Sequence, residues 1–199
     1  MAPRLLALLV LTLSAASASG QVVYGDPVPD AARELAAADG SRLSLDAAAG
    51  PNGLVVLFWS NACPWADRYA ERAAALVAQY APAGVGFVLV NSNDPAANER
   101  ETAAASREQA AQAGLAVPYL ADADGQLAAT FGARSTPHAF FFGPQRTLLY
   151  DGAIDDSPAV VDRVQTPYLR LAMDQSIAGL PVEVQRTQAF GCTIKPAAR

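Results

Sequence analysis

The chain has 199 residues, of which 52% are hydrophobic and 17% are charged, and its net charge is −5. This length and composition fit one compact domain with a hydrophobic core. A mildly acidic chain with a single lysine lacks the basic surface that binds nucleic acid. No internal stretch is long and apolar enough to span a bilayer.

The first twenty residues have the pattern of a secretory signal peptide. Arg4 precedes the apolar run 5–13, and the small residues 14–20 that follow offer cleavage sites. We therefore expect residues 1–20 to be removed and residues 21–199 to form one domain that is exported, either periplasmic or secreted, with no membrane attachment after cleavage. The alternative is an uncleaved membrane anchor, against which the shortness of the apolar run argues.

Apolar runs and turn residues alternate along the rest of the chain in the order of an α/β protein. The expected strands are a small hairpin around 39–45, buried runs at 54–59 and 85–90, a short strand at 117–120, and a late hairpin at 138–142 and 147–150. The expected helices cover residues 66–80, 97–113, 126–131 and 167–178. This order predicts a central mixed β-sheet flanked by helices.

Cys63 lies where the buried run 54–59 gives way to the helix expected at 66–80. The N-terminus of a helix offers unpaired N–H groups and a partial positive charge, and both favour a thiolate over a thiol. Because the thiolate is the nucleophile, the position predicts a reactive cysteine. The alternative is a small buried hydrophobic residue, against which the neighbours Asn61 and Pro64 argue.

Cys192, in the C-terminal tail, is the second of two cysteines. In an exported protein such a pair suggests a disulfide, either structural or redox-active. A flexible tail could bring Cys192 to Cys63, but the sequence leaves open a static disulfide, an unreactive thiol or a thiol that attacks oxidised Cys63. Two cysteines and one histidine cannot build a standard zinc site, so we expect neither a metal nor a cofactor.

The order of elements, the cysteine at the first strand–helix junction and Thr136-Pro137 before the late hairpin resemble the thioredoxin fold. More narrowly, the chain resembles the peroxiredoxin-like branch of the redoxin, or alkyl hydroperoxide reductase/thiol-specific antioxidant, superfamily. The resemblance covers about residues 25–195. It rests on the segments 61–64, 91–94, 118–120, 131–133, 136–137, 154–157 and 191–195.

This resemblance implies a role for several residues. Cys63 matches the peroxidatic cysteine, whose thiolate attacks the peroxide O–O bond to give a sulfenic acid. Ser60 matches the hydroxyl that contacts peroxide and thiolate, and Pro137 matches the cis-proline that faces the cysteine. Cys192 becomes the candidate resolving cysteine. The implied partners are a hydroperoxide substrate and an external thiol reductant, either a thioredoxin-like protein or a small thiol.

The chain departs from the family pattern at three points. Val56 stands where peroxiredoxins carry a proline. Their arginine at the start of the late strand is missing, so Arg134 and His138 are the nearby candidates for tuning the thiolate, with a solvated loop charge and a structural histidine as the alternatives. Ser60 replaces the first cysteine of a Cys-x-x-Cys motif, which excludes dithiol chemistry within the motif.

The predicted function is reduction of a peroxide by the Cys63 thiolate, with Cys192 or an external thiol resolving the sulfenic acid. A competing hypothesis is thiol–disulfide exchange with partner proteins. A third hypothesis is a non-catalytic binding module in which Cys63 and Cys192 form a permanent disulfide.

Overall fold

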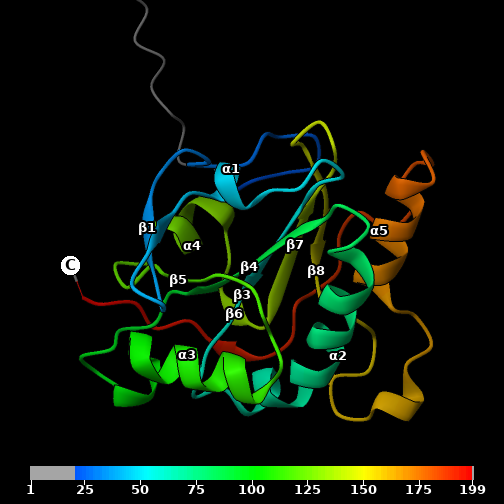
Figure 1. The fold of residues 1–199 in the computed structure, drawn as a ribbon. Helices are drawn as coiled ribbons and strands as arrows, with labels where there is room; N and C mark the ends of the chain where they lie inside the picture. Colours follow the sequence, from blue (N-terminus) through cyan, green and yellow to red (C-terminus); the bar gives the residue numbers. More distant parts are fainter. Residues whose placement is uncertain (1–20, 199) are drawn as a thin grey trace, which may run out of the picture.

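The computed structural model describes residues 21–198, so the predicted signal peptide and its cleavage site lie outside the described residues. Seven strands form one mixed sheet in the order β2-β1-β5-β4-β3-β7-β8 (Figure 1). These strands are β1 (Leu35–Ala37), β2 (Arg42–Leu43), β3 (Leu54–Phe58), β4 (Gly86–Asn91), β5 (Tyr119–Ala121), β7 (His138–Phe142) and β8 (Leu148–Gly152). The pairs β3–β4 and β4–β5 are parallel, and the other pairs are antiparallel.

Helices cover both faces of this sheet (Figure 1). They are α1 (Leu45–Ala48), α2 (Pro64–Tyr80), α3 (Ala103–Gln112), α4 (Gln126–Phe131) and α5 (Tyr168–Ile177). Helices α2, α3 and α5 bury apolar residues in one core cluster, and α1 and α4 bury theirs in a second cluster. The predicted central mixed sheet with flanking helices is confirmed.

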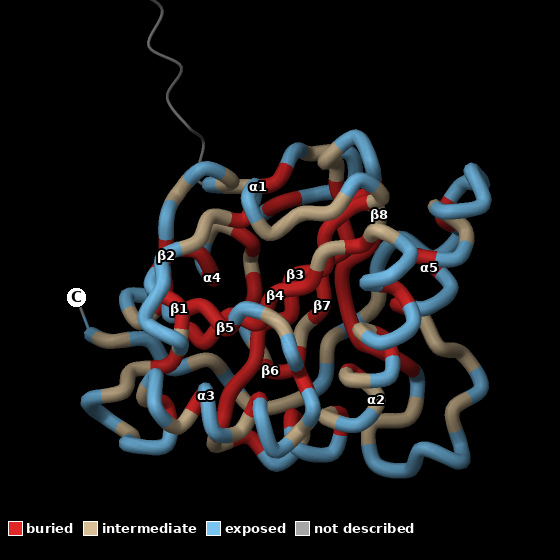
Figure 2. Tube along the Cα trace, in the orientation of Figure 1, coloured by how far each residue is buried: buried red, intermediate tan, exposed pale blue. Residues whose placement is uncertain are grey.

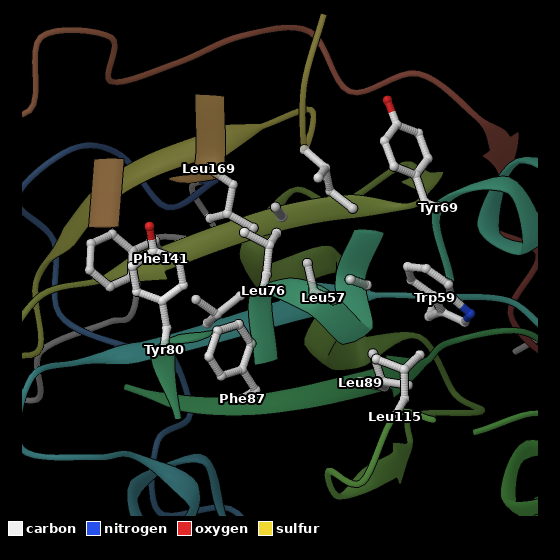
Figure 3. Packing of buried hydrophobic residues seen from close by; sticks show 14 of the residues in the cluster. Leu57, Trp59, Tyr69, Leu76, Tyr80, Phe87, Leu89, Leu115, Phe141 and Leu169 are labelled. Carbon is white, nitrogen blue, oxygen red and sulfur yellow. The ribbon is translucent and has the colours of Figure 1, made fainter. Parts of the chain in front are cut away.

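The interior strand β3 is buried along its whole length and contributes side chains to both clusters (Figure 2). Because side chains alternate across a strand, Val55 and Leu57 face one cluster while Val56 and Phe58 face the other. Figure 3 shows Leu57 packed among side chains from α2, α5 and the neighbouring strands. A strand buried on both faces reads as a continuous apolar run, which is why the sequence located β3 so closely.

The prediction of one helix over residues 97–113 is wrong for about the first third of that range. Residues Glu99–Glu101 form a short 3-10 turn, and α3 begins only at Ala103. Thr102 separates the two because its backbone is extended and its side chain accepts a hydrogen bond from Ala105 N, which makes it the N-cap of α3. Glu101, the last residue of the 3-10 turn, is buried.

The other expected elements differ from the observed ones by a few residues at their ends, and α4 and β7 match their predicted bounds. The hairpin around 39–45 is confirmed as β1 and β2. Helix α1 was not predicted, because its four residues are too few for a helical pattern. No helix within residues 21–198 is long and apolar enough to cross a membrane.

The C-terminal tail is anchored along its length rather than free. Its strand β9 (Cys192–Thr193) pairs antiparallel with β6 (Ser135–Thr136), as Figure 1 shows in red beside β6. Beyond β9, the backbone N–H of Lys195 donates to Asn93 Oδ1 and that of Ala197 to the carbonyl of Ala123. The sequence allowed a flexible tail to bring Cys192 to Cys63; in the structure the tail is held in place as a paired strand.

Candidate active site

Cys63 is the N-cap residue of α2, with an extended backbone, and Pro64 begins the helix. Proline suits this first helical position because it has no N–H to satisfy and its φ is already helical. The Cys63 thiol donates a hydrogen bond to the carbonyl oxygen of Thr136 at 3.1 Å. The predicted helix-terminal position of the cysteine is confirmed.

Cys63 is nevertheless buried, with 1% of its surface exposed, so the interpretation that its polar neighbours keep it out of the core is wrong. It packs in the same core cluster as Trp59 and Tyr69. Cys63 also lines a cavity. Any substrate must therefore enter that cavity to meet the sulfur.

The residue that accepts the thiol's hydrogen bond precedes a cis peptide bond, Thr136–Pro137. This geometry matches the proline that the family resemblance implies. Thr136 is buried at 1% exposure and belongs to β6. Its backbone therefore faces Cys63 on one side and the tail strand on the other.

Cys192 lies directly opposite Thr136 in the β6–β9 ladder. Cys63 and Cys192 are both free thiols in the structure. Partial burial, and after it the neighbouring Cys63 thiol, raise the pKa of the Cys192 thiol to about 11. The two cysteines, 129 positions apart in the sequence, are thus brought into one site.

The cavity that both cysteines line, called the thiol cavity below, has a volume of about 600 Å³. Its walls come from the segment 60–63, the loop 93–101 and the tail 192–195. A separate apolar cavity of about 260 Å³ lies between α2 and α5 and is lined by no cysteine. Within residues 21–198 no three side chains of metal-binding type converge.

Glu101 is a buried carboxylate in the wall of the thiol cavity, and the sequence did not single it out. Its two oxygens accept hydrogen bonds from Ser60 Oγ at 2.6 Å, Asn61 N at 3.0 Å, Ala62 N at 3.2 Å and Asn91 Nδ2 at 2.9 Å. A buried carboxylate is stable only with such partners. Glu101 thereby fixes the backbone immediately before Cys63.

The hydroxyl of Ser60 is hydrogen-bonded to Glu101 rather than to the cysteine. It lines the thiol cavity, but its proton is directed to Glu101, and within residues 21–198 no hydrogen bond joins Ser60 Oγ to the Cys63 sulfur. The contact between Ser60 and Cys63 is made by the backbone, from Cys63 N to the Ser60 carbonyl at 3.3 Å. Ser60 therefore shapes the loop in this state of the site.

Asn61 is a second organising residue of the loop. Its amide donates to the carbonyl of Arg100 and to Ser106 Oγ, each at 2.8 Å, and its Oδ1 accepts from Tyr119 OH at 2.7 Å. These partners come from the 3-10 turn, α3 and β5. A buried asparagine with every partner supplied is typical of a structural hub, although the sequence showed only a polar neighbour of Cys63.

His138 and Arg134 are not among the residues that line the thiol cavity, and within residues 21–198 neither forms a hydrogen bond with the Cys63 sulfur. His138 alternates with Ala139 along β7 and stacks on Phe140, which belongs to the core cluster on the face opposite Cys63. Burial lowers the pKa of His138 to about 4, so the imidazole is neutral near pH 7. Arg134 is exposed, and its backbone carbonyl accepts the N–H of Ile194.

The arrangement of sheet, helices, cis-proline and helix-capping cysteine is that of a thioredoxin-fold protein of the redoxin type. The sequence matches the AhpC/TSA family over residues 24–151. This match spans well over half of the chain, and the chain therefore belongs to the AhpC/TSA family.

Several solved structures have a similar fold. A hypothetical protein from Sinorhizobium meliloti is 31% identical with a TM-score of 0.82, over 90% of this chain and 98% of its own. An uncharacterized conserved protein from Geobacillus kaustophilus is 28% identical with a TM-score of 0.82, over 89% of this chain and 95% of its own. A thioredoxin-like protein in its oxidized form shares the fold at 18% identity and a TM-score of 0.63, over 78% of this chain and 97% of its own. No curated protein gives a match.

Proposed function

We propose that this protein is an exported thiol peroxidase that uses Cys63 and Cys192 as a pair. The Cys63 thiolate attacks one oxygen of a hydroperoxide, forming Cys63–SOH and an alkoxide or hydroxide that takes up a proton. Cys192 then attacks the sulfenic sulfur, forming the Cys63–Cys192 disulfide and releasing water. An external dithiol or two monothiols return both cysteines to the reduced state.

One observation supports this proposal most strongly: Thr136 contacts both cysteines, and both cysteines line one cavity. Its carbonyl accepts the hydrogen bond of the Cys63 thiol, and its ladder partner is Cys192. Buried free cysteines without a function are scattered through cores as small apolar residues. Two free thiols placed on the same cavity by a strand from the far end of the chain favour redox chemistry.

Thiol–disulfide exchange is the second candidate, and two observations favour it. Within residues 21–198 the thiol cavity has no arginine in its lining to stabilise the negative charge that develops on a peroxide. The cavity also holds about 600 Å³, which is far more than hydrogen peroxide fills. In this mechanism Cys63 forms a mixed disulfide with a partner, and Cys192 releases it.

Stopped-flow tryptophan fluorescence separates the two mechanisms. Trp59 and Trp65 flank Cys63, and Trp65 packs edge-on against Phe190 of the tail with ring centroids 4.7 Å apart. The reduced protein is mixed with hydrogen peroxide, and Cys63→Ser is the control. A Cys63-dependent change that is orders of magnitude faster than the reaction of free cysteine supports the peroxidase. A rate like that of free cysteine, together with fast reaction toward a small disulfide, supports exchange.

Export is a separate part of the proposal and rests on the sequence of residues 1–20. Expression of the full chain in a bacterial host followed by N-terminal mapping of the product tests it. A mature chain that begins near Ser19 or Gln21 in the periplasmic or culture fraction supports export. A full-length chain retained in the cytoplasm contradicts it.

A further inference from the structure

The apolar cavity between α2 and α5, called the helix cavity below, shares no lining residue with the thiol cavity. Its volume of about 260 Å³ is just below the range of about 300–1,000 Å³ that is typical of pockets for drug-sized ligands. The helix cavity therefore suits a smaller organic molecule. Its apolar wall is formed by Ala75, Leu76, Ile154, Val161, Val164 and Pro167.

One wall of the helix cavity belongs to an irregular segment that is nevertheless held in place. This segment contains the 3-10 turn Val161–Arg163. The carboxylate of Asp156 accepts hydrogen bonds from the backbone N–H groups of Gln165 and Thr166, beyond the turn. Val161 lines the cavity, yet 58% of its surface is exposed. An apolar ligand in the cavity would cover part of this surface, which is favourable in water.

Three charged side chains also line the helix cavity: Arg72, Asp155 and Arg170. Arg72 and Asp155 neutralise each other, with Nη1 and Oδ2 2.6 Å apart. Arg170 is exposed and, within residues 21–198, forms no ion pair. Asp174, one turn further along α5, instead accepts the hydroxyl of Tyr80. The charged residues of the lining therefore sum to one positive charge.

Arg72 has one hydrogen-bond donor to spare. Its Nη1 and Nη2 groups donate to Asp155 Oδ2 and to the carbonyls of Arg68, Ser157 and Pro158. Its Nε is buried and has no hydrogen-bond partner within the described part of the chain. A buried N–H group without an acceptor is unfavourable. A ligand that brought an acceptor oxygen to Arg72 would remove this cost.

We propose that the helix cavity binds a small organic carboxylate, with its apolar body between Leu76 and Val164 and its carboxylate on Arg170, beside Arg72. A guanidinium is weakly hydrated and pairs with a carboxylate through two parallel N–H groups. A neutral molecule of the same shape lacks this contact, and an ammonium is repelled. The inference does not depend on the proposed peroxidase reaction, because no cysteine lines this cavity.

NMR titration of the ¹⁵N-labelled, reduced protein with four small molecules tests the inference. Hexanoate has both the apolar body and the carboxylate, hexanol has the body alone, acetate has the charge alone, and hexylamine has the opposite charge. Hexanoate should bind about tenfold more tightly than hexanol or acetate, and hexylamine should bind least. Added salt should reduce the advantage of hexanoate over hexanol. The amide shifts should centre on Leu76, Ile154 and Val164 rather than on the two cysteines.

Two variants separate the charge from the apolar wall. Arg170→Gln should weaken hexanoate binding about tenfold and leave hexanol binding unchanged, because it removes the charge alone. Arg107→Gln, which removes an exposed charge from α3, is the matched control and should change neither. Ala75→Leu should fill part of the cavity and weaken hexanoate and hexanol together. Position 75 is exposed on α2 and leucine is a good helix former, so this variant should fold.

Absence of hexanoate binding, equal affinities for hexanoate and hexanol, or shifts centred on the thiol cavity would overturn the inference. An equal effect of Arg170→Gln and Arg107→Gln would do the same. If Arg170→Gln does not fold, Ala75→Leu decides, since an unchanged affinity for hexanoate in that variant contradicts the proposed site. The peroxide reaction is measured separately. A protein that binds hexanoate in this way but is slow with peroxide loses the proposed function alone.

Discussion

The sulfur of Cys63 lies 3.1 Å from the carbonyl oxygen of Thr136 and donates a hydrogen bond to it. Thr136 is also the residue with which Cys192 is paired in the β6–β9 ladder. One short strand therefore holds both thiols in place. Because the tail is fixed on both sides of Cys192, oxidation of the pair requires side-chain rotation and local adjustment rather than folding of a free segment.

Replacing Cys192 by serine should separate the two steps of the proposed reaction. The Cys63 thiolate should still react with peroxide at an unchanged rate, but the sulfenic acid should persist and accumulate higher oxidation states. Mass spectrometry after trapping the sulfenic acid measures this. Thr193→Ala, in the same strand, is the matched control and should form the disulfide normally. Loss of sulfenic acid formation in Cys192→Ser would assign Cys192 to the attacking site itself.

Gly191→Ala should detach the tail strand. A Cβ atom at position 191 would overlap the carbonyl oxygen of Thr136, the atom that holds Cys63. The atoms in the way are backbone atoms of Thr136 and Pro137, which cannot swing aside as a flexible side chain could. The overlap is therefore removed only if β9 moves, which we expect to cost about 1–3 kcal/mol of stability. We expect disulfide formation after peroxide treatment to slow at least several-fold, measured by quenched alkylation of free thiols, while the first oxidation of Cys63 continues. An unchanged rate would show that strand pairing does not position Cys192.

Glu101→Gln should disturb the loop before Cys63. The Glu101 carboxylate accepts hydrogen bonds from Ser60 Oγ, Asn61 N and Ala62 N. The side-chain amide of glutamine would point its own N–H group at one of these donors, which would then lose its acceptor. An unsatisfied buried donor costs about 1–3 kcal/mol. Urea denaturation should report a loss of that size, and the rate of Cys63 alkylation should change with it. Glu99→Gln, two residues away and exposed, should be neutral in both assays.

His138 should make the protein sensitive to acid without taking part in the chemistry. Burial lowers its pKa from 6.5 to about 4, with Asp151 opposing the shift and Arg186 adding to it. Between about pH 6.5 and about pH 4, His138 is therefore protonated in the unfolded chain but stays neutral in the folded chain. As the pH is lowered from about 6.5 to about 4, the free energy of unfolding decreases, and this group contributes at most about 1.4 kcal/mol per pH unit.

The variant His138→Phe isolates that contribution. Nδ1 of His138 is buried without a hydrogen-bond partner, so phenylalanine removes no bond at this atom. Urea denaturation at several pH values should show a smaller loss of stability in acid for the variant than for the parent protein. The peroxide rate at pH 7 should be the same in both. A lower peroxide rate in a fully folded variant would return His138 to the active site.

The elements that the sequence located well are those with strong apolar patterns. The run that became β3 is buried on both faces, and the stripe of α2 faces a single cluster, so both were visible as periodicities. The position of Cys63 at the start of α2 followed from these two elements alone. Its burial did not follow, because the sulfur bonds to Thr136 and packs in a cluster with residues from distant parts of the chain.

Three features of the site depend on tertiary pairing and left no local pattern. Glu101 lies in a 3-10 turn that the helical pattern did not reveal, and nothing distinguishes it in sequence from the exposed Glu99. The register of β9 on β6 involves only two residue pairs. Alternation along β7 puts His138 on the same face of the sheet as Phe140. The sequence could not show that α2 and Cys63 lie on the opposite face, because that depends on how the whole sheet is packed.

The most direct test of the central claim is to determine the oxidation state and pairing of the two cysteines after the reduced protein has reacted with one equivalent of hydrogen peroxide. Tryptic cleavage places Cys63 in the peptide 43–68 and Cys192 in the peptide 187–199, because Lys195 is followed by proline. Non-reducing mass spectrometry should find these two peptides joined and lighter by two hydrogens, within the time of the fluorescence change. Peptides that remain separate, with Cys63 carrying oxygen and Cys192 still a free thiol, would contradict a paired thiol site.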